Sequence, residues 1–167
     1  KARPAALYSQ RQAEVVGLGN LDDHFDRLAE ADWIVEVIVE RLPIKQDLMA
    51  RIEQVRKPDA IVSTNTSGLS IAAIAEKCGD DFCRHFLGVH FFNPPRVLQL
   101  VEIVAGADNS SAKVDAARSY CETVLGKTVV DCKDTPGFIG NRIGCYVLAV
   151  AAVQTLRQNV TVEEAHA

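Results

Sequence analysis

The segment W-I-V-E-V-I-V, residues 33–39, is followed one residue later by R-L-P-I-K-Q-D-L-M-A-R-I-E-Q-V, residues 41–55, and together they decide the fold class. The first segment is a nearly continuous apolar run of the length of a strand. Pro43 suits the first turn of a helix, and Leu48 and Ile52 recur after it at helical spacing. A strand followed by a helix is the repeating unit of an α/β protein.

The same alternation continues along the chain. Further strands are expected at residues 60–63, 87–92, 100–103 and 128–132, with helices near residues 70–75 and 112–125. Strands that alternate with helices indicate a mostly parallel sheet with flanking helices. We expect the turn at Pro94 and Pro95 to fold the strand of residues 100–103 back along the preceding one.

The pattern changes at residue 134. The segment D-T-P-G-F-I-G-N-R begins with helix-capping residues and a proline, and helical spacing then continues to about Gln158. Thr161 and Glu164 are spaced as a capping box, which predicts another helix start. We therefore predict one domain at residues 1–133 and the beginning of an all-helical domain at residues 134–167.

The first thirty residues contain the pair Gly17 and Gly19, which resembles part of a dinucleotide-binding glycine loop. Asp22 stands where the third glycine of that loop should be, so we reject this interpretation. A short strand at residues 15–16 is expected instead, followed by a helix that Asp22 and Asp23 would cap.

Composition excludes several classes of protein. Apolar residues make up 48% of the chain, so a sizeable core is expected, and a net charge of -4 argues against nucleic acid as a partner. The sequence lacks an apolar run of about 18 residues, so no membrane span is predicted. The five scattered cysteines suit neither a disulfide framework nor a metal site. Reduced thiols and the absence of a signal-peptide pattern predict a cytoplasmic protein.

His90 and Glu102 lie in two expected strands, at positions where a core would favour apolar side chains. If the turn between the strands brings them together, the carboxylate would fix the imidazole tautomer and leave the other nitrogen free to exchange a proton. The alternative is a core histidine bonded to a backbone carbonyl, with Glu102 a solvated strand residue.

Other polar residues follow directly on strands. Ser67 and Asn65 belong to S-T-N-T-S after the second strand, where α/β sheets collect ligands, although a helix cap would use the same residues. Asn93 is either a pocket residue or an Asn-Pro turn starter, and Asn141 is either a pocket residue or a surface amide. Their spacing alone leaves both readings open.

Glu40 and Lys45 flank the loop after the first strand. A cofactor could lie at this end of the sheet, and the alternative is a surface ion pair of little energetic value.

Four blocks together resemble the 3-hydroxyacyl-CoA dehydrogenases, the NAD-dependent enzymes of fatty-acid β-oxidation. In chain order the blocks are V-E-V-I-V-E-R-L-P-I-K, S-T-N-T-S-G-L-S, G-V-H-F-F-N-P-P-R-V-L-Q-L-V-E-I and D-T-P-G-F-I-G-N-R. The resemblance covers residues 31–167 and implies a partial Rossmann-like domain followed by the start of a helical one. The first thirty residues look more like bacterial multifunctional members that also carry an enoyl-CoA hydratase unit.

The resemblance implies a role for each candidate. His90 would be the base that accepts the proton of the substrate 3-hydroxyl while hydride passes to NAD, and Glu102 would orient it. Ser67 and Asn141 would bind the reacting oxygen of the acyl-CoA substrate, and Asn93 would line the same pocket.

For the cofactor, the resemblance places Glu40, Lys45 and Asn65 near NAD. The family's glycine-rich phosphate loop is missing, and its helical domain is only begun. We therefore expect the isolated chain to be an inactive fragment that binds NAD weakly. We also expect the longer protein to form a homo-oligomer through the rest of that helical domain. The alternatives are a related NAD-dependent hydroxyacid dehydrogenase and a non-catalytic descendant with a structural role.

Overall fold

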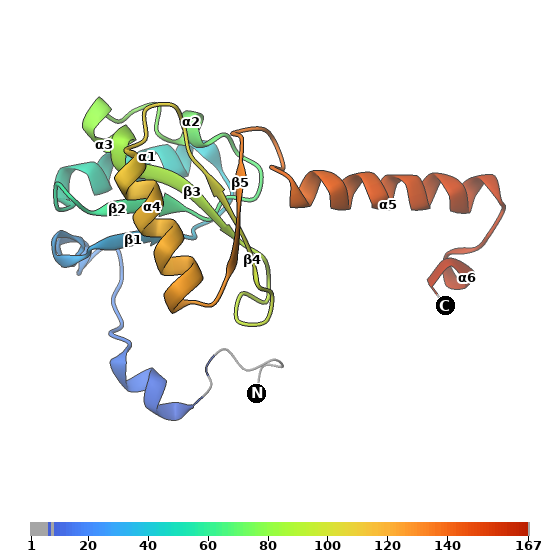
Figure 1. Ribbon diagram of the computed structural model, residues 1–167, viewed down its shortest axis with the longest axis horizontal. Coiled ribbons are helices and arrows are strands. Elements are labelled where there is room, and N and C mark those ends of the chain that lie inside the picture. The colour runs from blue at the N-terminus through green and yellow to red at the C-terminus, as the bar shows by residue number, and fades with distance from the viewer. Residues whose placement is uncertain (1–6, 8, 167) are drawn as a thin grey trace.

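The computed structural model describes residue 7 and residues 9–166, which form a sheet with helices on both faces (Figure 1). Within these residues the strands lie side by side in chain order: β1 (Trp33–Glu36), β2 (Ile61–Thr64), β3 (Phe86–Phe91), β4 (Leu100–Val104) and β5 (Thr128–Cys132). Strands β1, β2 and β3 are mutually parallel, β4 is antiparallel to β3, and β5 is parallel to β4. The predicted mostly parallel α/β sheet is confirmed.

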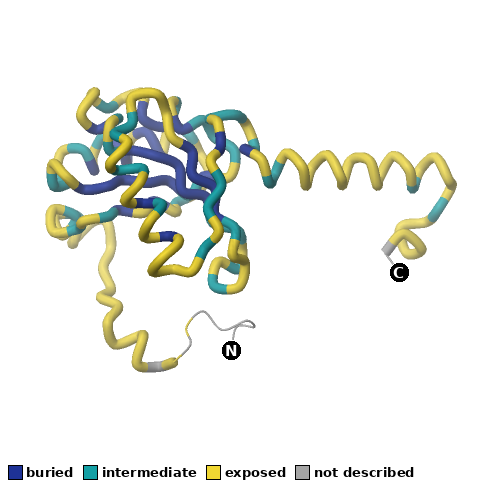
Figure 2. The backbone as a smooth tube through the Cα atoms, in the orientation of Figure 1, coloured by how far each residue is buried: buried dark blue, intermediate teal, exposed yellow. Residues whose placement is uncertain are grey.

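Helices cover both faces of the sheet, and each face forms its own hydrophobic core with the helices that cover it. One face carries α1 (Leu42–Val55), α2 (Ile71–Ile74) and α3 (Asp80–His85). The other carries α4 (Ser111–Ser119) and the π-helical turn η3 (Tyr120–Val124). Met49, Ile74 and Phe82 pack in the first core, and Ala117 and Cys121 pack in the second. Buried residues therefore run along the central strands, as Figure 2 shows.

Successive residues of β3 point to opposite faces of the sheet. Leu87 and Val89 belong to the core beneath α4, whereas Phe86 belongs to the core beneath α2. Gly88 also faces α2, because a Cβ atom there would lie 2.8 Å from Cδ1 of Ile71. The side-chain period of two places His90 on this same face.

Two helices follow the sheet, α5 (Gly140–Arg157) and α6 (Val162–His166), and α5 extends away from the sheet and its covering helices (Figure 1). The predicted capping box of α6 is confirmed. The Glu164 backbone N–H donates to Thr161 Oγ1 at 3.2 Å, and the Thr161 backbone N–H donates to Glu164 Oε2 at 2.9 Å. None of the described helices has both the length and the apolar composition that a membrane crossing needs.

The predicted start of the terminal helix at Asp134 is wrong. The Asp134 carboxylate instead caps α2, where it accepts hydrogen bonds from Ser70 Oγ at 2.8 Å and from the Ile71 backbone N–H at 2.9 Å. The chain then turns through Gly137 and Phe138, whose φ angles are 74° and 44°, before α5 begins. Asp134 therefore ties the entry of α5 to the start of α2.

Two predictions near the N-terminus are also wrong. Residues 15–16 form no strand, because Val15 ends the 3₁₀ helix η1 (Gln10–Val15). The next helix, η2 (Phe25–Glu30), begins after His24 rather than after the two aspartates. The Asn20 side chain accepts the backbone N–H groups of Asp22 and Asp23 at 2.9 and 2.7 Å, which holds them in a turn.

The first predicted strand is shorter than residues 33–39. It ends at Glu36, whose Oε1 accepts the backbone N–H of Ile38 at 2.5 Å and so turns the chain out of the sheet.

Candidate active site

The His90–Glu102 pair forms in the structure. The two residues are direct partners in the antiparallel ladder of β3 and β4, so their side chains lie on the same face of the sheet. His90 Nδ1 lies 2.7 Å from Glu102 Oε2, and the residues are only 4% and 1% exposed. The alternative of a core histidine bonded to a backbone carbonyl, beside a solvated glutamate, is therefore wrong.

The second oxygen of Glu102 holds the beginning of α5. Oε1 accepts the backbone N–H groups of Ile139 at 3.0 Å and Gly140 at 2.7 Å, and it lies 3.5 Å from Cys132 Sγ. Unpaired N–H groups at a helix start carry partial positive charge, so a carboxylate is stable there. One side chain thus joins the imidazole to the helix that carries Asn141.

Glu102 is ionised in this environment. Burial acts to raise the pKa of the carboxyl, but the hydrogen bonds from His90, Gly140 and Ile139 outweigh it and hold that pKa below the ordinary value. An ionised carboxylate only accepts hydrogen bonds, so His90 must donate from Nδ1–H. Neutral His90 consequently presents Nε2 as a proton acceptor.

Aromatic rings surround the imidazole. The His90 ring centroid lies 4.6 Å from that of Phe92 and 5.7 Å from that of Phe138. These ring contacts restrict how the imidazole can rotate.

A cavity of about 480 Å³ opens beside His90, at the carboxyl ends of β1, β2 and β3. Its lining includes five of the residues predicted from the sequence: Asn65, Ser67, His90, Asn93 and Asn141. The turn of residues 93–95 and the start of α5 form its other walls. The structure thus brings residues from four separate segments to one cavity, as open α/β sheets do with their ligand sites.

Two of these polar side chains also form hydrogen bonds with the backbone of segments that line the cavity. Asn65 Oδ1 accepts the Phe91 backbone N–H at 2.8 Å and so links the ends of β2 and β3. Asn141 Nδ2 donates to the Ser67 carbonyl oxygen at 3.0 Å, which brings the first turn of α5 to the loop after β2. Asn141 is therefore more than a surface amide.

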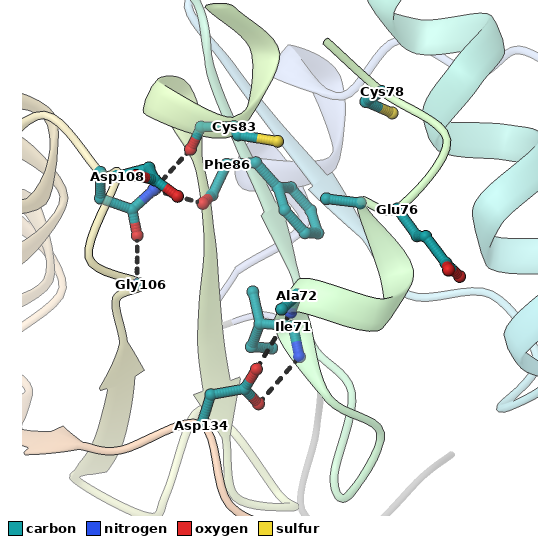
Figure 3. Close-up of a pocket in the computed structure, with 11 residues that line it drawn as sticks. Ile71, Ala72, Glu76, Cys78, Cys83, Phe86, Gly106, Asp108 and Asp134 are labelled. Atoms are coloured by element: carbon teal, nitrogen blue, oxygen red, sulfur yellow. Dashed lines mark hydrogen bonds between the residues drawn. The ribbon is translucent and has the colours of Figure 1, made fainter. Parts of the chain in front are cut away.

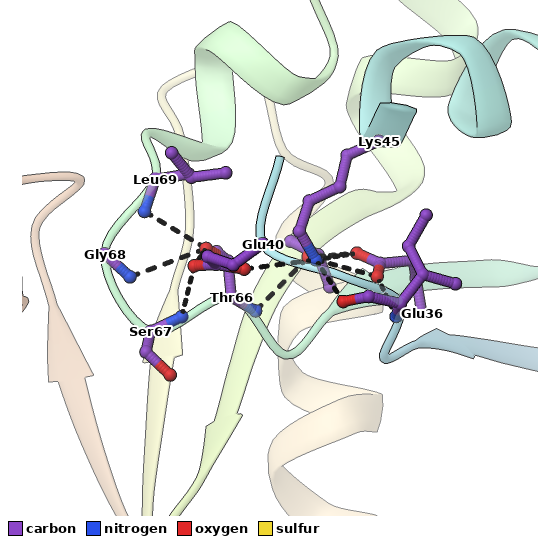
Figure 4. A network of polar contacts seen from close by, with 9 residues as sticks. Glu36, Glu40, Lys45, Thr66, Ser67, Gly68 and Leu69 are labelled. Atoms are coloured by element: carbon purple, nitrogen blue, oxygen red, sulfur yellow. Dashed lines mark hydrogen bonds and ion pairs between the residues drawn. The ribbon is translucent and has the colours of Figure 1, made fainter. Parts of the chain in front are cut away.

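Glu40 and Lys45 are not among the residues that line this cavity, and they lie within a network of polar contacts (Figure 4). The alternative of a surface ion pair is wrong, because the Lys45 side chain is 1% exposed. Its ammonium lies 2.8 Å from Glu36 Oε1 and 3.3 Å from Glu40 Oε2. Burial acts to raise the pKa of Glu40, but hydrogen bonds from Thr66 and the Ser67 backbone and the charge of Lys45 lower it.

Glu36 is the member of this network that our sequence analysis missed. It accepts hydrogen bonds from Lys45 and from Thr64 Oγ1, the latter at 2.6 Å, and it is 3% exposed. The available signal was a carboxylate within the apolar run of residues 33–39, where an ion is stable only with a partner.

A second cavity of about 280 Å³ lies between α2, α3 and the loop after β4, lined by Cys78, Cys83, Asp134 and mainly apolar residues (Figure 3). Burial raises the pKa of Cys78 to about 12, and burial also raises the pKa of Cys83, so neither thiol is a ready nucleophile. Asp134 is occupied in capping α2. The arrangement offers no acid–base pair comparable to His90 and Glu102.

The chain is similar in sequence to known proteins. The family model described as "3-hydroxyacyl-CoA dehydrogenase, NAD binding domain" matches residues 1–135. A probable 3-hydroxyacyl-CoA dehydrogenase of Bacillus subtilis is 45% identical over 98% of this chain and 21% of its own length. A putative fatty acid oxidation complex trifunctional enzyme of Rickettsia felis is 35% identical over 96% of this chain and 22% of its own length.

The fold is similar to solved structures as well. The crystal structure of 3-hydroxybutyryl-CoA dehydrogenase from Escherichia coli K12 superposes with a TM-score of 0.74 and 36% identity, over 81% of this chain and 28% of that one. The present chain thus spans about a fifth of the two relatives above and less than a third of this structure.

Proposed function

Because the chain belongs to the 3-hydroxyacyl-CoA dehydrogenase family, of which it carries the NAD-binding domain, we propose that the complete protein oxidises a 3-hydroxyacyl-CoA to the 3-ketoacyl-CoA in fatty-acid β-oxidation. The observation that carries the proposal is the buried His90–Glu102 pair beside the cavity at the strand ends. This arrangement suits the removal of a hydroxyl proton by a buried imidazole whose tautomer is fixed by its carboxylate partner.

In this proposal His90 is the general base. Its Nε2 accepts the proton of the substrate 3-hydroxyl, and the imidazolium that forms is stabilised by the Glu102 carboxylate 2.7 Å from Nδ1. The Ile139 and Gly140 backbone N–H groups hold Glu102 in place, so the pair needs no rearrangement during the reaction.

The cavity residues place the reacting oxygen. Ser67 offers a hydroxyl and Asn141 an amide to it, while Asn93 lines the wall contributed by the turn after β3. Because proton transfer requires a donor–acceptor distance of about 2.6–3.2 Å, these contacts determine whether Nε2 can reach the hydroxyl.

The residues present fit the nicotinamide end of NAD. The cavity lies at the carboxyl ends of three parallel strands, with Asn65 and Ser67 in its lining, and the half-exposed Glu40 carboxylate accepts the Ser67 backbone N–H. When bound, NAD supplies the hydride acceptor of the reaction. Among the described residues, Gly17 and Gly19 do not fit its pyrophosphate, because they follow no strand and precede only η2.

The proposal is tested by assaying the complete protein with a 3-hydroxyacyl-CoA and NAD, and with acetoacetyl-CoA and NADH in reverse. We expect turnover in both directions, and we expect His90→Gln to lower kcat by about 10² to 10⁴-fold, as for loss of a general base. His85→Gln, on α3 and bonded to its own helix backbone, is the matched control and should leave kcat unchanged. Turnover of free hydroxyacids without turnover of CoA thioesters would contradict the proposal.

We also propose that the protein acts in the cytoplasm. All five cysteines are free in the structure, which suits a reducing compartment. Fractionation of cells that express the tagged complete protein tests this, and recovery of the protein outside the cytoplasmic fraction would contradict it.

A further inference from the structure

We propose that Lys127 is a positioning residue for the acyl-CoA substrate: its ammonium holds the connection between β3 and β4 that forms one wall of the cavity beside His90. This inference rests on the proposed function, because the wall affects kinetics only if the cavity binds the acyl group.

The connection between β3 and β4, residues 92–99, lies directly beside the acid–base pair. Phe92, Asn93 and Pro95 line the cavity, and the Phe92 ring centroid lies 4.6 Å from that of His90. The antiparallel pairing of the two strands ends at Phe91, so the connection lies outside the ladder. Its place in the fold therefore depends on other hydrogen bonds.

The backbone of the connection offers few donors for such bonds. Pro94 and Pro95 lack an N–H group, so only their carbonyl oxygens can hold this part of the backbone. The Pro94 carbonyl oxygen accepts the backbone N–H groups of Val97 at 2.9 Å and Leu98 at 3.0 Å, which closes a turn within the connection. To hold that turn against the rest of the protein, a donor must come from another segment.

Lys127 supplies this donor from the turn that precedes β5. Its ammonium donates to the Pro95 carbonyl oxygen and, at 2.8 Å, to the Leu98 carbonyl oxygen. Figure 1 shows the connection beside that turn. Hydrogen bonds from a charged donor are stronger than those between neutral groups, so one side chain secures two points of the connection.

The main chain is held on both sides of the Lys127 side chain. The Lys127 backbone N–H donates to the Cys121 carbonyl oxygen at 2.9 Å, and the Thr128 backbone N–H donates to the Gln99 carbonyl oxygen at 2.9 Å. Gly126, with a φ angle of 65°, permits the turn between η3 and β5. The partly buried Lys127 side chain thus extends from a fixed base to the connection.

Loss of the Lys127 bonds should loosen the cavity wall and leave the acid–base pair in place. His90 and Glu102 are paired through the register of β3 against β4, to which the ammonium makes no contribution. A cavity whose wall is formed for only part of the time binds its ligand more weakly by that fraction. Once the substrate is bound, the wall is complete, so the loss affects KM rather than kcat.

The proposal is tested by Lys127→Met in the complete protein, which removes the donors and keeps the apolar stem. We expect the KM for a 3-hydroxyacyl-CoA to rise by about tenfold, while kcat and the KM for NAD change by less than about twofold. An unchanged KM for the acyl-CoA, or an equal rise in the KM for NAD, would overturn the proposal.

Lys113→Met is the matched control. Lys113 is also partly buried and donates to a backbone carbonyl oxygen, that of Asp59 at 2.6 Å, which lies outside the connection. All three kinetic constants should stay at their wild-type values in this variant. A rise in the KM for the acyl-CoA equal to that in Lys127→Met would overturn the proposal.

Hydrogen exchange at the Val97 and Leu98 amides gives a readout that needs no turnover. We expect faster exchange in Lys127→Met than in the wild type, and no change in Lys113→Met. If Lys127→Met does not fold, Lys127→Gln, which also lacks the ammonium, carries the same comparison. Absence of wild-type turnover would count against the proposed function alone, whereas unchanged exchange at these amides in the folded variant would overturn the positioning role.

Discussion

At the scale of single residues, Glu102 connects parts of the molecule that the chain separates widely. One carboxylate oxygen faces His90 on β3, and the other accepts the backbone N–H groups of Ile139 and Gly140 where α5 begins. An oxygen with several donors is held in direction as well as in distance. Substitution of Glu102 should therefore affect both proton chemistry and the stability of the fold.

We expect Glu102→Gln to lower kcat by about 10³-fold, because a neutral amide can neither fix the tautomer with Nδ1–H nor stabilise the imidazolium. Steady-state kinetics of the complete protein measures this. Glu122→Gln is the matched control, since that carboxylate is half-exposed on η3 and forms an ion pair with Arg118 at 4.0 Å. A loss of less than about tenfold in Glu102→Gln would contradict the role of the pair.

Glu102 should also make stability depend on pH. Its pKa is lower in the folded protein than the ordinary value of 4.5, so its ionised form contributes stability that is complete above that value. This contribution is lost as the pH falls through the lowered pKa. The difference in unfolding free energy between the wild type and Glu102→Gln should thus shrink below pH 4.5, as urea unfolding would show. A difference that stays constant with pH would contradict this.

The sequence indicated which residues could meet at the cavity but not the residues that support them. His90, Ser67 and Asn141 stand in motifs that can be read along the chain, and the structure brings them to one cavity. The role of Glu36 depends on Thr64, 28 residues away, and on an ammonium nine residues away. Such partners become visible only when the strands are placed side by side.

At the scale of elements, the first residues of α5 lie in close contact with the sheet. A Cβ atom on Gly140 would lie 2.5 Å from Cζ of Phe92 and 3.5 Å from Glu102 Oε1. Glycine at this position lets the helix start approach the carboxylate directly. Further along the same helix, a Cβ atom on Gly144 would meet nothing within 4 Å.

These two glycines give opposite predictions. Gly140→Ala should destabilise the protein by about 1–3 kcal/mol, because Phe92 or the helix must move to admit the methyl group. Gly144→Ala should stabilise it by about 0.5–1 kcal/mol, because alanine is favoured over glycine inside a helix. Thermal unfolding of both variants measures the contrast. Equal effects on the unfolding temperature would contradict the contact at Gly140.

The order of strands and helices could be predicted because each element has its own local periodicity. The boundaries that were wrong depend on contacts between distant segments. Asp134 could cap its own helix by local rules, but Ser70, 64 residues earlier, uses its carboxylate instead. The strand of residues 33–39 ends early because Glu36 binds the backbone two residues on. Neither of these interactions can be recognised from local sequence patterns.

At the scale of the whole molecule, the described residues form a helix-covered sheet from which the long helix α5 extends away (Figure 1). Apolar residues of α5 are open to solvent, among them Tyr146 at 71%, Leu148 at 71% and Leu156 at 77% exposure. The division into domains at residue 134 and the formation of a homo-oligomer stay predictions that these observations do not test.

The distribution of site residues predicts how the isolated chain binds NAD. The proposed nicotinamide site is the cavity beside His90, but no described strand leads into a glycine-rich turn that could hold the pyrophosphate. We expect calorimetry to show binding at least about 10²-fold weaker for residues 1–167 than for the complete protein, which is the matched control. Equal affinity would contradict this and would show that these residues suffice.

The register of β3 against β4 has a consequence for how this protein family can diversify. His90 and Glu102 face each other because of backbone pairing, so residues 92–99, which join the two strands, have no part in setting their separation. That connection contributes Asn93 and Pro95 to the cavity wall. The part of the connection beyond Phe92, whose ring packs against His90, can therefore vary and reshape the cavity wall without changing the register that pairs His90 with Glu102.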